Sequence, residues 1–180
     1  MKLEEKQISR ETIYEGHIIR LVKDIALLPN GKVAPREVCL HNGAVAVLPL
    51  LDDGRVIVER QFRYPHSRVF LEIPAGKLDT PDEEIVSAAM RELKEETGAV
   101  ASQLVPLGKM VPSAAILSEV IHIFLARGLS FGERELDEDE FINLELMDFD
   151  TLYRMCESGE IEDAKTVVAV MRALPHVKKQ

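Results

Sequence analysis

The sequence predicts a protein of the α/β (α+β) class, in which several short strands are combined with three helices. Runs rich in β-branched and aromatic residues recur from residue 17 to residue 147, and most are bounded by Gly, Pro, Asn or Asp. Apolar residues at helical spacing instead cover residues 81–97, 149–157 and 163–174. With 180 residues, of which 46% are hydrophobic, the chain can bury a core without disulfide bonds.

Two strands near the N-terminus are expected to form a small β segment. Residues 17–28 and 32–40 flank Pro29-Asn30-Gly31, a turn signal, and therefore predict a hairpin. This segment is expected to precede one larger domain. The predicted division of the chain is residues 1–42 for the N-terminal β segment and residues 43–180 for the domain.

The larger domain is expected to begin with a second hairpin. Residues 44–51 and 55–62 flank Asp52-Asp53-Gly54, where Asp-Gly supplies the positive φ angles of a tight turn, and we expect both strands in one central sheet. Pro74-Ala75-Gly76 ends the next strand at residues 69–73. Further strands are expected at residues 105–111, 119–126 and 141–147, with the acidic residues 133–140 as a surface loop.

The helix predicted at residues 81–97 carries start and stop signals. Thr80 and Glu83 predict a capping box, Pro81 suits the first helical position, and Gly98 suits a left-handed cap at the end. One side of this helix is apolar and would seat it on a sheet, through Val86, Ala89, Met90 and Leu93.

Three carboxylates gather on another side of the same helix. Glu92 lies three residues before Glu95 and four before Glu96, so the side chains occupy neighbouring positions. A Glu-rich helix face is most often only solvated surface. Like charges this close become favourable if a hard divalent cation binds them, and Mg²⁺, with Mn²⁺ as an alternative, is the ion expected if the face is more than solvated surface.

The segment from Gly76 to Ala99 resembles the Nudix box, Gly-x5-Glu-x7-Arg-Glu-U-x-Glu-Glu-x-Gly-U, in which U is a bulky aliphatic residue. The second half matches fully through Gly98. In the first half, six residues rather than five separate Gly76 from Glu83, and the final position holds the small Ala99. If the five-residue spacing is kept, Asp82 takes the Glu position.

The resemblance implies a metal-dependent Nudix hydrolase with the Nudix fold, an α/β/α sandwich around a mixed β-sheet. Glu92, Glu95 and Glu96 would ligate the metal ions, together with the backbone carbonyl of Ala75. Arg91 would complete the catalytic helix by pairing with a carboxylate, either Glu95 or one at the helix start, and so hold the ligands in place.

Similarity extends over roughly residues 36–166 and looks closest to the ADP-ribose pyrophosphatase branch of the Nudix hydrolases. The supporting pieces are Arg36-Glu37-Val38, His41-Asn42-Gly43-Ala44-Val45, Arg60-Gln61-Phe62-Arg63-Tyr64, Glu72-Ile73-Pro74-Ala75-Gly76, Pro112-Ser113 and Asp163-Ala164-Lys165-Thr166. Ala114 and Ala115 replace the second proline and the glycine of the usual Pro-Ser-Pro-Gly pattern. This departure bears on the substrate more than on the reaction class.

The expected substrate-binding residues are Arg36, Arg63, Glu72, Pro112 and Ser113. A guanidinium donates two hydrogen bonds to a phosphate at once, so Arg36 and Arg63 suit a diphosphate, although a surface ion pair is the alternative for Arg36. Glu72 is expected to face the ribose or the adenine, or else to pair with Arg63 or Arg68.

The acidic loop is expected to supply the catalytic base. This is what the resemblance implies, because the loop lies where the Nudix family carries a catalytic base outside the box; a charged run that is only solvated surface is the alternative. Since the loop stands directly before the strand at residues 141–147, it could deliver a carboxylate to a metal-bound water. Glu140 is the expected base, with Glu138 as the second choice.

Composition narrows the possible partners. The chain has 22 Lys+Arg against 31 Asp+Glu, a formal charge of −9, whereas nucleic-acid binding needs clustered cations. No run approaches the roughly 18 apolar residues of a membrane span, and the two cysteines, Cys39 and Cys156, stand far apart. We therefore expect a cytoplasmic protein with no nucleic-acid or membrane partner. In the branch that it resembles, the N-terminal segment often exchanges across a homodimer, which implies a homodimer here.

The expected activity is hydrolysis of ADP-ribose to AMP and ribose 5-phosphate. The alternatives are a hydrolase for another nucleoside diphosphate sugar, such as GDP-mannose, or for a dinucleotide, and a sensor that binds a nucleotide sugar without cleaving it. The intact Glu92, Glu95 and Glu96 favour the enzyme over the sensor.

Overall fold

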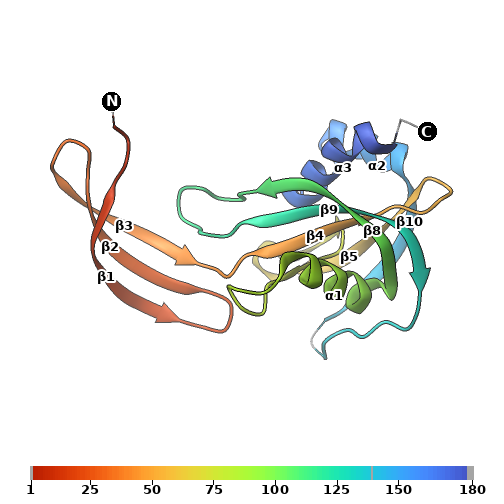
Figure 1. Ribbon diagram of the computed structural model, residues 1–180, viewed down its shortest axis with the longest axis horizontal. Coiled ribbons are helices and arrows are strands. Elements are labelled where there is room, and N and C mark those ends of the chain that lie inside the picture. The colour runs from red at the N-terminus through yellow and green to blue at the C-terminus, as the bar shows by residue number, and fades with distance from the viewer. Residues whose placement is uncertain (1, 139, 178–180) are drawn as a thin grey trace.

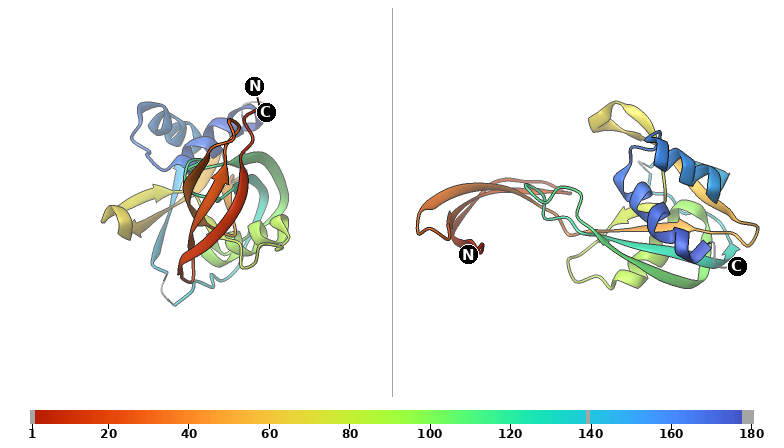
Figure 2. Two further views of the ribbon diagram at one scale, coloured as in Figure 1. Left: turned by 90° about the vertical axis from the view of Figure 1, so that its left-hand side faces the viewer. Right: turned by 90° about the horizontal axis from the view of Figure 1, so that it is seen from above.

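The structure, a computed structural model, describes residues 2–138 and 140–177 and has two parts (Figure 1). A three-stranded antiparallel sheet projects from the main body and is formed by β1 (Lys6–Glu15), β2 (Arg20–Leu27) and β3 (Val33–Leu40) in that order. Seen from above, it stands off from the main body, which it approaches along the loop between β8 and β9 (Figure 2). The backbone of Cys39 bonds that loop through Ile116 and Ser118, at N···O distances of 2.7 and 2.9 Å.

The prediction of a two-stranded hairpin at the N-terminus was incomplete. The hairpin exists as β2 and β3, but β1 adds a third strand along β2. Every residue of β1 is exposed, so no alternation of buried and exposed positions marks it in the sequence. Backbone pairing with β2 holds it in place, together with two hydrogen bonds from the Arg10 guanidinium to the Asp24 carboxylate, at 2.8 and 2.7 Å.

The main body contains two further sheets. A mixed four-stranded sheet has the order β7 (Ala75–Lys77), β4 (Ala44–Pro49), β9 (Ile121–Phe131) and β8 (Ala99–Met110), and only the β4–β9 pair is parallel. An antiparallel three-stranded sheet has the order β10 (Ile142–Asp148), β5 (Arg55–Arg63) and β6 (Arg68–Glu72). A short 3-10 turn, Tyr64–His66, joins β5 to β6.

The hairpin predicted around Asp52-Asp53-Gly54 forms, but its strands do not share one sheet as expected. Gly54 adopts a φ of 86°, and the Leu51 amide donates to the Arg55 carbonyl at 2.8 Å. Beyond the single bridge between Leu50 and Val56, the strands diverge into different sheets. The turn chemistry is local and carries no information about this divergence.

Helices cover both sides of these sheets, as the α/β/α expectation requires (Figure 1). Because side chains alternate along a strand, Val45 and Val47 of β4 pack towards α1 (Ile85–Thr97), whereas Ala46 and Leu48 pack towards α2 (Phe149–Ser158) and α3 (Ala164–Val177). Within the described residues, no helix combines the length and the hydropathy needed to cross a membrane.

Several predicted boundaries were wrong. Helix α1 begins at Ile85 rather than Pro81, because Glu84, not Thr80, caps it by accepting bonds from the Val86 and Ser87 amides at 3.1 and 2.7 Å. Strand β8 begins at Ala99 rather than residue 105, since small buried alanines carry its first inward positions. Helix α3 continues through Pro175 to Val177, beyond the end predicted at residue 174.

Gly98 ends α1 as predicted, with a left-handed φ of 71°. A Cβ at this position would lie 2.5 Å from the carbonyl oxygen of Gly132. Gly98→Ala is therefore expected to destabilise the protein by more than the control Gly159→Ala. Gly159 ends α2 at a φ of 80°, and a Cβ there would meet no atom within 4 Å. The control carries only the backbone cost of about 1 kcal/mol, and Gly98→Ala adds at least about 1 kcal/mol of crowding. Urea unfolding measures both values, and equal losses would contradict the close approach.

Candidate active site

A cleft of about 680 Å³ opens beside the C-terminal half of α1. Side chains from several elements reach it, so residues far apart in the sequence meet there. Among the residues predicted for the site, those that line the cleft are Arg63, Ala75, Glu96, Pro112 and Glu140.

Two of the three predicted metal-binding carboxylates lie on the buried side of α1. Glu92 is 8% exposed and Glu96 is 2% exposed. The amide of Ala75 donates to Glu96 at 2.9 Å, and a Cβ at Gly76 would lie 2.0 Å from the carboxyl carbon of Glu92. Strand β7 is thus packed directly on both carboxylates, and a side chain at position 76 would have to displace the Glu92 carboxylate.

Burial sets the electrostatics of this side of α1. It raises the pKa of Glu96 to about 10, an effect to which the nearby carboxylates of Glu59, Glu92 and Glu140 add. Burial also raises the pKa of Glu92 to about 7, although Arg91 opposes the change. Charging these groups in the absence of a cation is therefore unfavourable.

Glu59 of β5 belongs to the same group, although the sequence reasoning missed it. The residue is fully buried, and among the described residues neither of its carboxylate oxygens has a hydrogen-bond partner. Burial raises its pKa to about 7, and the charge of Lys165 opposes this change. Alternation along β5 was the available signal, since Ile57, two residues earlier, faces the core beneath α1.

Arg91 holds the outer edge of the carboxylate group. Its guanidinium donates to Glu92 at 2.8 Å, to Glu95 at 3.0 Å and to Glu83 at 3.2 Å. Glu83 is the residue given by the seven-residue spacing of the box. Glu95 lies further out than Glu92 and Glu96, with 33% of its side chain exposed.

The donor set fits a hard divalent cation. Carboxylate oxygens from Glu59, Glu92 and Glu96 are buried, Glu92 pairs with Arg91, and the oxygens of Glu59 accept no hydrogen bond within the described residues. Such oxygens are the ligands that Mg²⁺ and Mn²⁺ prefer. Within residues 2–138 and 140–177, no three acidic, His or Cys side chains converge in a metal-binding arrangement. Arg91 and the Ala75 amide instead engage Glu92 and Glu96.

An ion-pair network also bounds the cleft. Arg63 donates two bonds to Glu72, at 2.8 and 2.7 Å, and Lys165 contacts both Glu72 and Asp163. Glu72 is 1% exposed and does not line the cleft, whereas Arg63 and Lys165 do. Glu72 therefore has the ion pair with Arg63 that was the alternative to a substrate contact.

Of the remaining predicted residues, three do not line the cleft, namely Arg36, Ser113 and Glu138. Arg36 lies on β3 and pairs with Glu5 at 2.8 and 2.6 Å, outside the residues that line the cleft. Ser113 also lies outside them, although its neighbour Pro112 is among them. Glu140 lines the cleft but Glu138 does not; Asp139 between them lies outside the described residues.

Removing divalent cations is expected to make stability depend on pH. The pKa values of Glu92 and Glu96 in the fold, about 7 and about 10, lie above the ordinary value of 4.5. Their protonated forms therefore favour folding, and this stabilisation is complete below about pH 4.5 and is lost as pH rises through the folded values. In EDTA, the melting temperature should decrease as the pH is raised from about 6 to about 8.5. Added Mn²⁺ should raise the melting temperature by more at the higher pH. Stability that rises with pH in EDTA would contradict this account.

Comparisons with known proteins agree with this geometry. Residues 40–171 match the NUDIX domain, and residues 5–39 match the nucleoside diphosphate sugar hydrolase N-terminal domain. The chain belongs to the Nudix family. It is 45% identical over 170 residues to the ADP-ribose pyrophosphatase of Bacillus subtilis, covering 93% of this chain and 91% of that protein. Nudix hydrolases generally use divalent metal ions, which the buried carboxylates suit.

Two further relatives extend the comparison. This Nudix chain is 39% identical over 169 residues to the methanol dehydrogenase activator of Bacillus methanolicus, covering 93% of this chain and 91% of that protein. Its fold matches a crystal structure of an ADP compounds hydrolase with a TM-score of 0.86 at 24% identity, over 99% of this chain and 97% of the other. The match supports the predicted Nudix fold.

Proposed function

We propose that this Nudix protein is a divalent-metal-dependent hydrolase that cleaves the diphosphate of ADP-ribose to AMP and ribose 5-phosphate. The observation that carries the proposal is a single cleft that is lined both by the carboxylates Glu96 and Glu140 and by the cations Arg63 and Lys165. A diphosphate ester needs a cation site for the reacting phosphate and basic groups for its other oxygens. The similarity to the Bacillus subtilis ADP-ribose pyrophosphatase favours this substrate.

Of the four predicted ligands, Glu92, Glu96 and the Ala75 carbonyl would hold the metal ion, for which Mg²⁺ is proposed and Mn²⁺ is the alternative. Glu95, with 33% of its side chain exposed and paired with Arg91, would support the site from its edge. When bound, the ion supplies positive charge to the phosphate oxygens and lowers the pKa of water. Arg91 keeps Glu92 and Glu95 in position through its bonds of 2.8 and 3.0 Å.

The other side chains orient the reactants and accept the proton. Arg63 and Lys165, fixed by Glu72, orient the diphosphate by donating hydrogen bonds to its oxygens. Glu140 takes the proton from the attacking water as the water oxygen bonds to phosphorus. The phosphorus–oxygen bond of the anhydride breaks, and the two phosphates leave as AMP and ribose 5-phosphate.

We also propose that the enzyme is a cytoplasmic homodimer, in which residues 1–42 form the contact segment and residues 43–180 the catalytic domain. The projecting sheet exposes apolar side chains, among them Ile8, Ile13 and Val33, and Ile18 reaches the cleft. Such a surface is typical of an interface. Light scattering should give twice the mass of one chain, and a clean monomer would overturn the dimer.

The substrate is tested by initial rates with Mg²⁺ for ADP-ribose, GDP-mannose, a diadenosine polyphosphate and NADH. We expect kcat/KM for ADP-ribose to exceed that for GDP-mannose by at least about tenfold, since pocket contacts alone discriminate bases to that degree. A preference for another compound would refute the assigned substrate. Tight binding without turnover of any of them would instead identify a sensor.

A further inference from the structure

Glu59 is a buried carboxylate to which no group of the described residues donates a hydrogen bond. It lies on the central strand of the β10–β5–β6 sheet, opposite Leu144 on one side and Glu72 on the other. The residue is 0% exposed, and neither carboxylate oxygen accepts a hydrogen bond within the described residues. Burying a charge in this way is costly unless something compensates it, so a purely structural position would favour an apolar residue.

The nearby positive groups are already engaged elsewhere. Arg63 directs two hydrogen bonds to Glu72, and Lys165 contacts Glu72 and Asp163. Both cations are close enough to act on the charge of Glu59, but neither bonds to it. Glu59 is therefore not the ion-pair partner that holds either of them in place.

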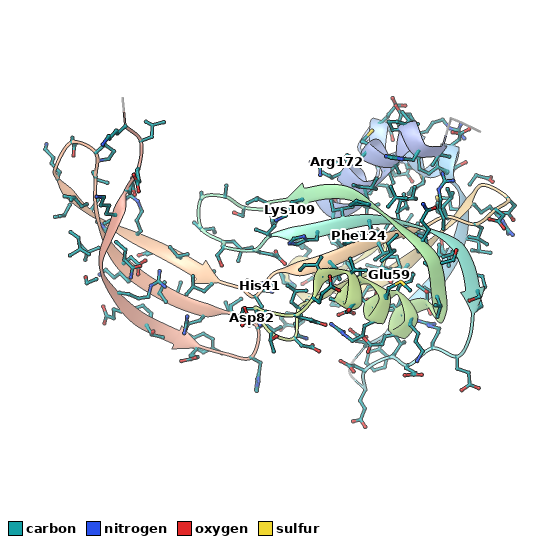
Figure 3. All side chains as sticks on the ribbon, viewed as in Figure 1. His41, Glu59, Asp82, Lys109, Phe124 and Arg172 are labelled. Atoms are coloured by element: carbon teal, nitrogen blue, oxygen red, sulfur yellow. The ribbon has the colours of Figure 1, made fainter. Side chains whose placement is uncertain are left out.

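On its other side, Glu59 faces the carboxylates of α1. Its neighbour Val58 packs in the core beneath α2 and α3, so Glu59 points to the opposite face, on which Ile57 packs beneath α1. Among the charged groups that raise the pKa of Glu96, Glu59 has the largest effect, ahead of Glu92 and Glu140. Figure 3 labels Glu59 within the main body, at the level of α1. Two carboxylates from different elements thus lie close together without a shared counter-charge.

We propose that Glu59 is a further ligand of the divalent-cation site and binds the same ion as Glu96 through a carboxylate oxygen. The ion would then link β5 of one sheet to α1, and the ligand set would extend beyond the motif helix and the Ala75 carbonyl. The inference rests on the proposed function to the extent that this function requires a divalent ion. It explains why the chain keeps a charge where an apolar residue would pack with less cost.

The test is Mn²⁺ binding to the full chain by calorimetry, for the wild type and for Glu59→Gln. The substitution keeps the shape of the side chain and removes its charge, so we expect Mn²⁺ affinity to fall at least tenfold. Melting temperature in EDTA should stay unchanged or rise, and its increase on adding Mn²⁺ should shrink. Glu145→Gln, which changes an exposed carboxylate on the adjacent strand β10, is the control and should alter neither quantity.

Two outcomes would overturn the assignment. One is wild-type Mn²⁺ affinity in Glu59→Gln together with a lower melting temperature in EDTA, which would make Glu59 a structural group. The other is a wild-type protein that binds no Mn²⁺. Neither measurement uses turnover, so Mn²⁺ binding that depends on Glu59 without cleavage of any nucleotide sugar would leave this inference standing and refute the proposed function alone.

Discussion

Glu96→Gln is expected to lower kcat/KM for ADP-ribose by about 10³-fold, the scale seen when one preorganised charge contact to a reacting group is removed. Glu96 is 2% exposed, lines the cleft and lies among other carboxylates that need a cation. A glutamine keeps the shape of the side chain and can still accept the hydrogen bond from the Ala75 amide, but it has no charge to neutralise a cation. The expected loss is therefore in catalysis, and stability in EDTA should not fall.

Glu95→Gln is the matched control for this variant. It makes the same chemical change one residue away, but Glu95 is 33% exposed and its carboxylate accepts a hydrogen bond from Arg91 rather than from β7. We expect kcat/KM for ADP-ribose to fall by at most about tenfold, which is the lower end of the effect seen when a group that orients metal ligands is removed. Initial rates at saturating Mg²⁺ measure both variants. Equal losses would contradict the conclusion that the buried side of α1 forms the site.

Glu72→Ala is expected to have the largest effect on stability, a loss of about 3 kcal/mol. Glu72 is buried between Arg63 and Lys165, and removing one member of a buried ion pair leaves uncompensated charge. For a chain of this length, the melting temperature should fall by about 6–12 °C. Because Arg63 and Lys165 line the cleft, the KM for ADP-ribose should also rise. Thermal unfolding and steady-state kinetics on the same preparation measure the two effects.

Glu145→Ala tests whether burial causes that loss. Glu145 pairs with Arg60 in the same sheet, but both side chains are well exposed, at 39% and 45%. Surface pairs of this kind contribute about 0–1 kcal/mol, so the melting temperature should change little. If both variants lost equal stability, the network around Glu72 would not have the role assigned to it.

Parts of the fold that depend on local signals could be predicted from the sequence. Gly98 marks the end of α1, and Asp53-Gly54 marks a turn, because both need positive φ angles. Strand β1 could not be found in this way, since none of its residues is buried. The separation of β4 and β5 into two sheets also could not be predicted, because it depends on distant pairings with β9 and β10.

The site was predictable to the extent that its residues share a spacing. Glu92, Glu96 and Arg91 stand at fixed positions on one helix, so a motif finds them. Glu59 stands alone on a strand, and only the packing of β5 against the α1 side reveals its place. The pairing of Glu72 with Arg63 likewise became definite only once β5 and β6 were placed side by side.

The most direct test of the account is ³¹P NMR of ADP-ribose incubated with the full chain and Mg²⁺. The two diphosphate resonances should be replaced by those of AMP and ribose 5-phosphate, and EDTA should stop the conversion. Diphosphate resonances that persist unchanged with saturating Mg²⁺ and with saturating Mn²⁺ would contradict the assignment of this cleft as a pyrophosphohydrolase site.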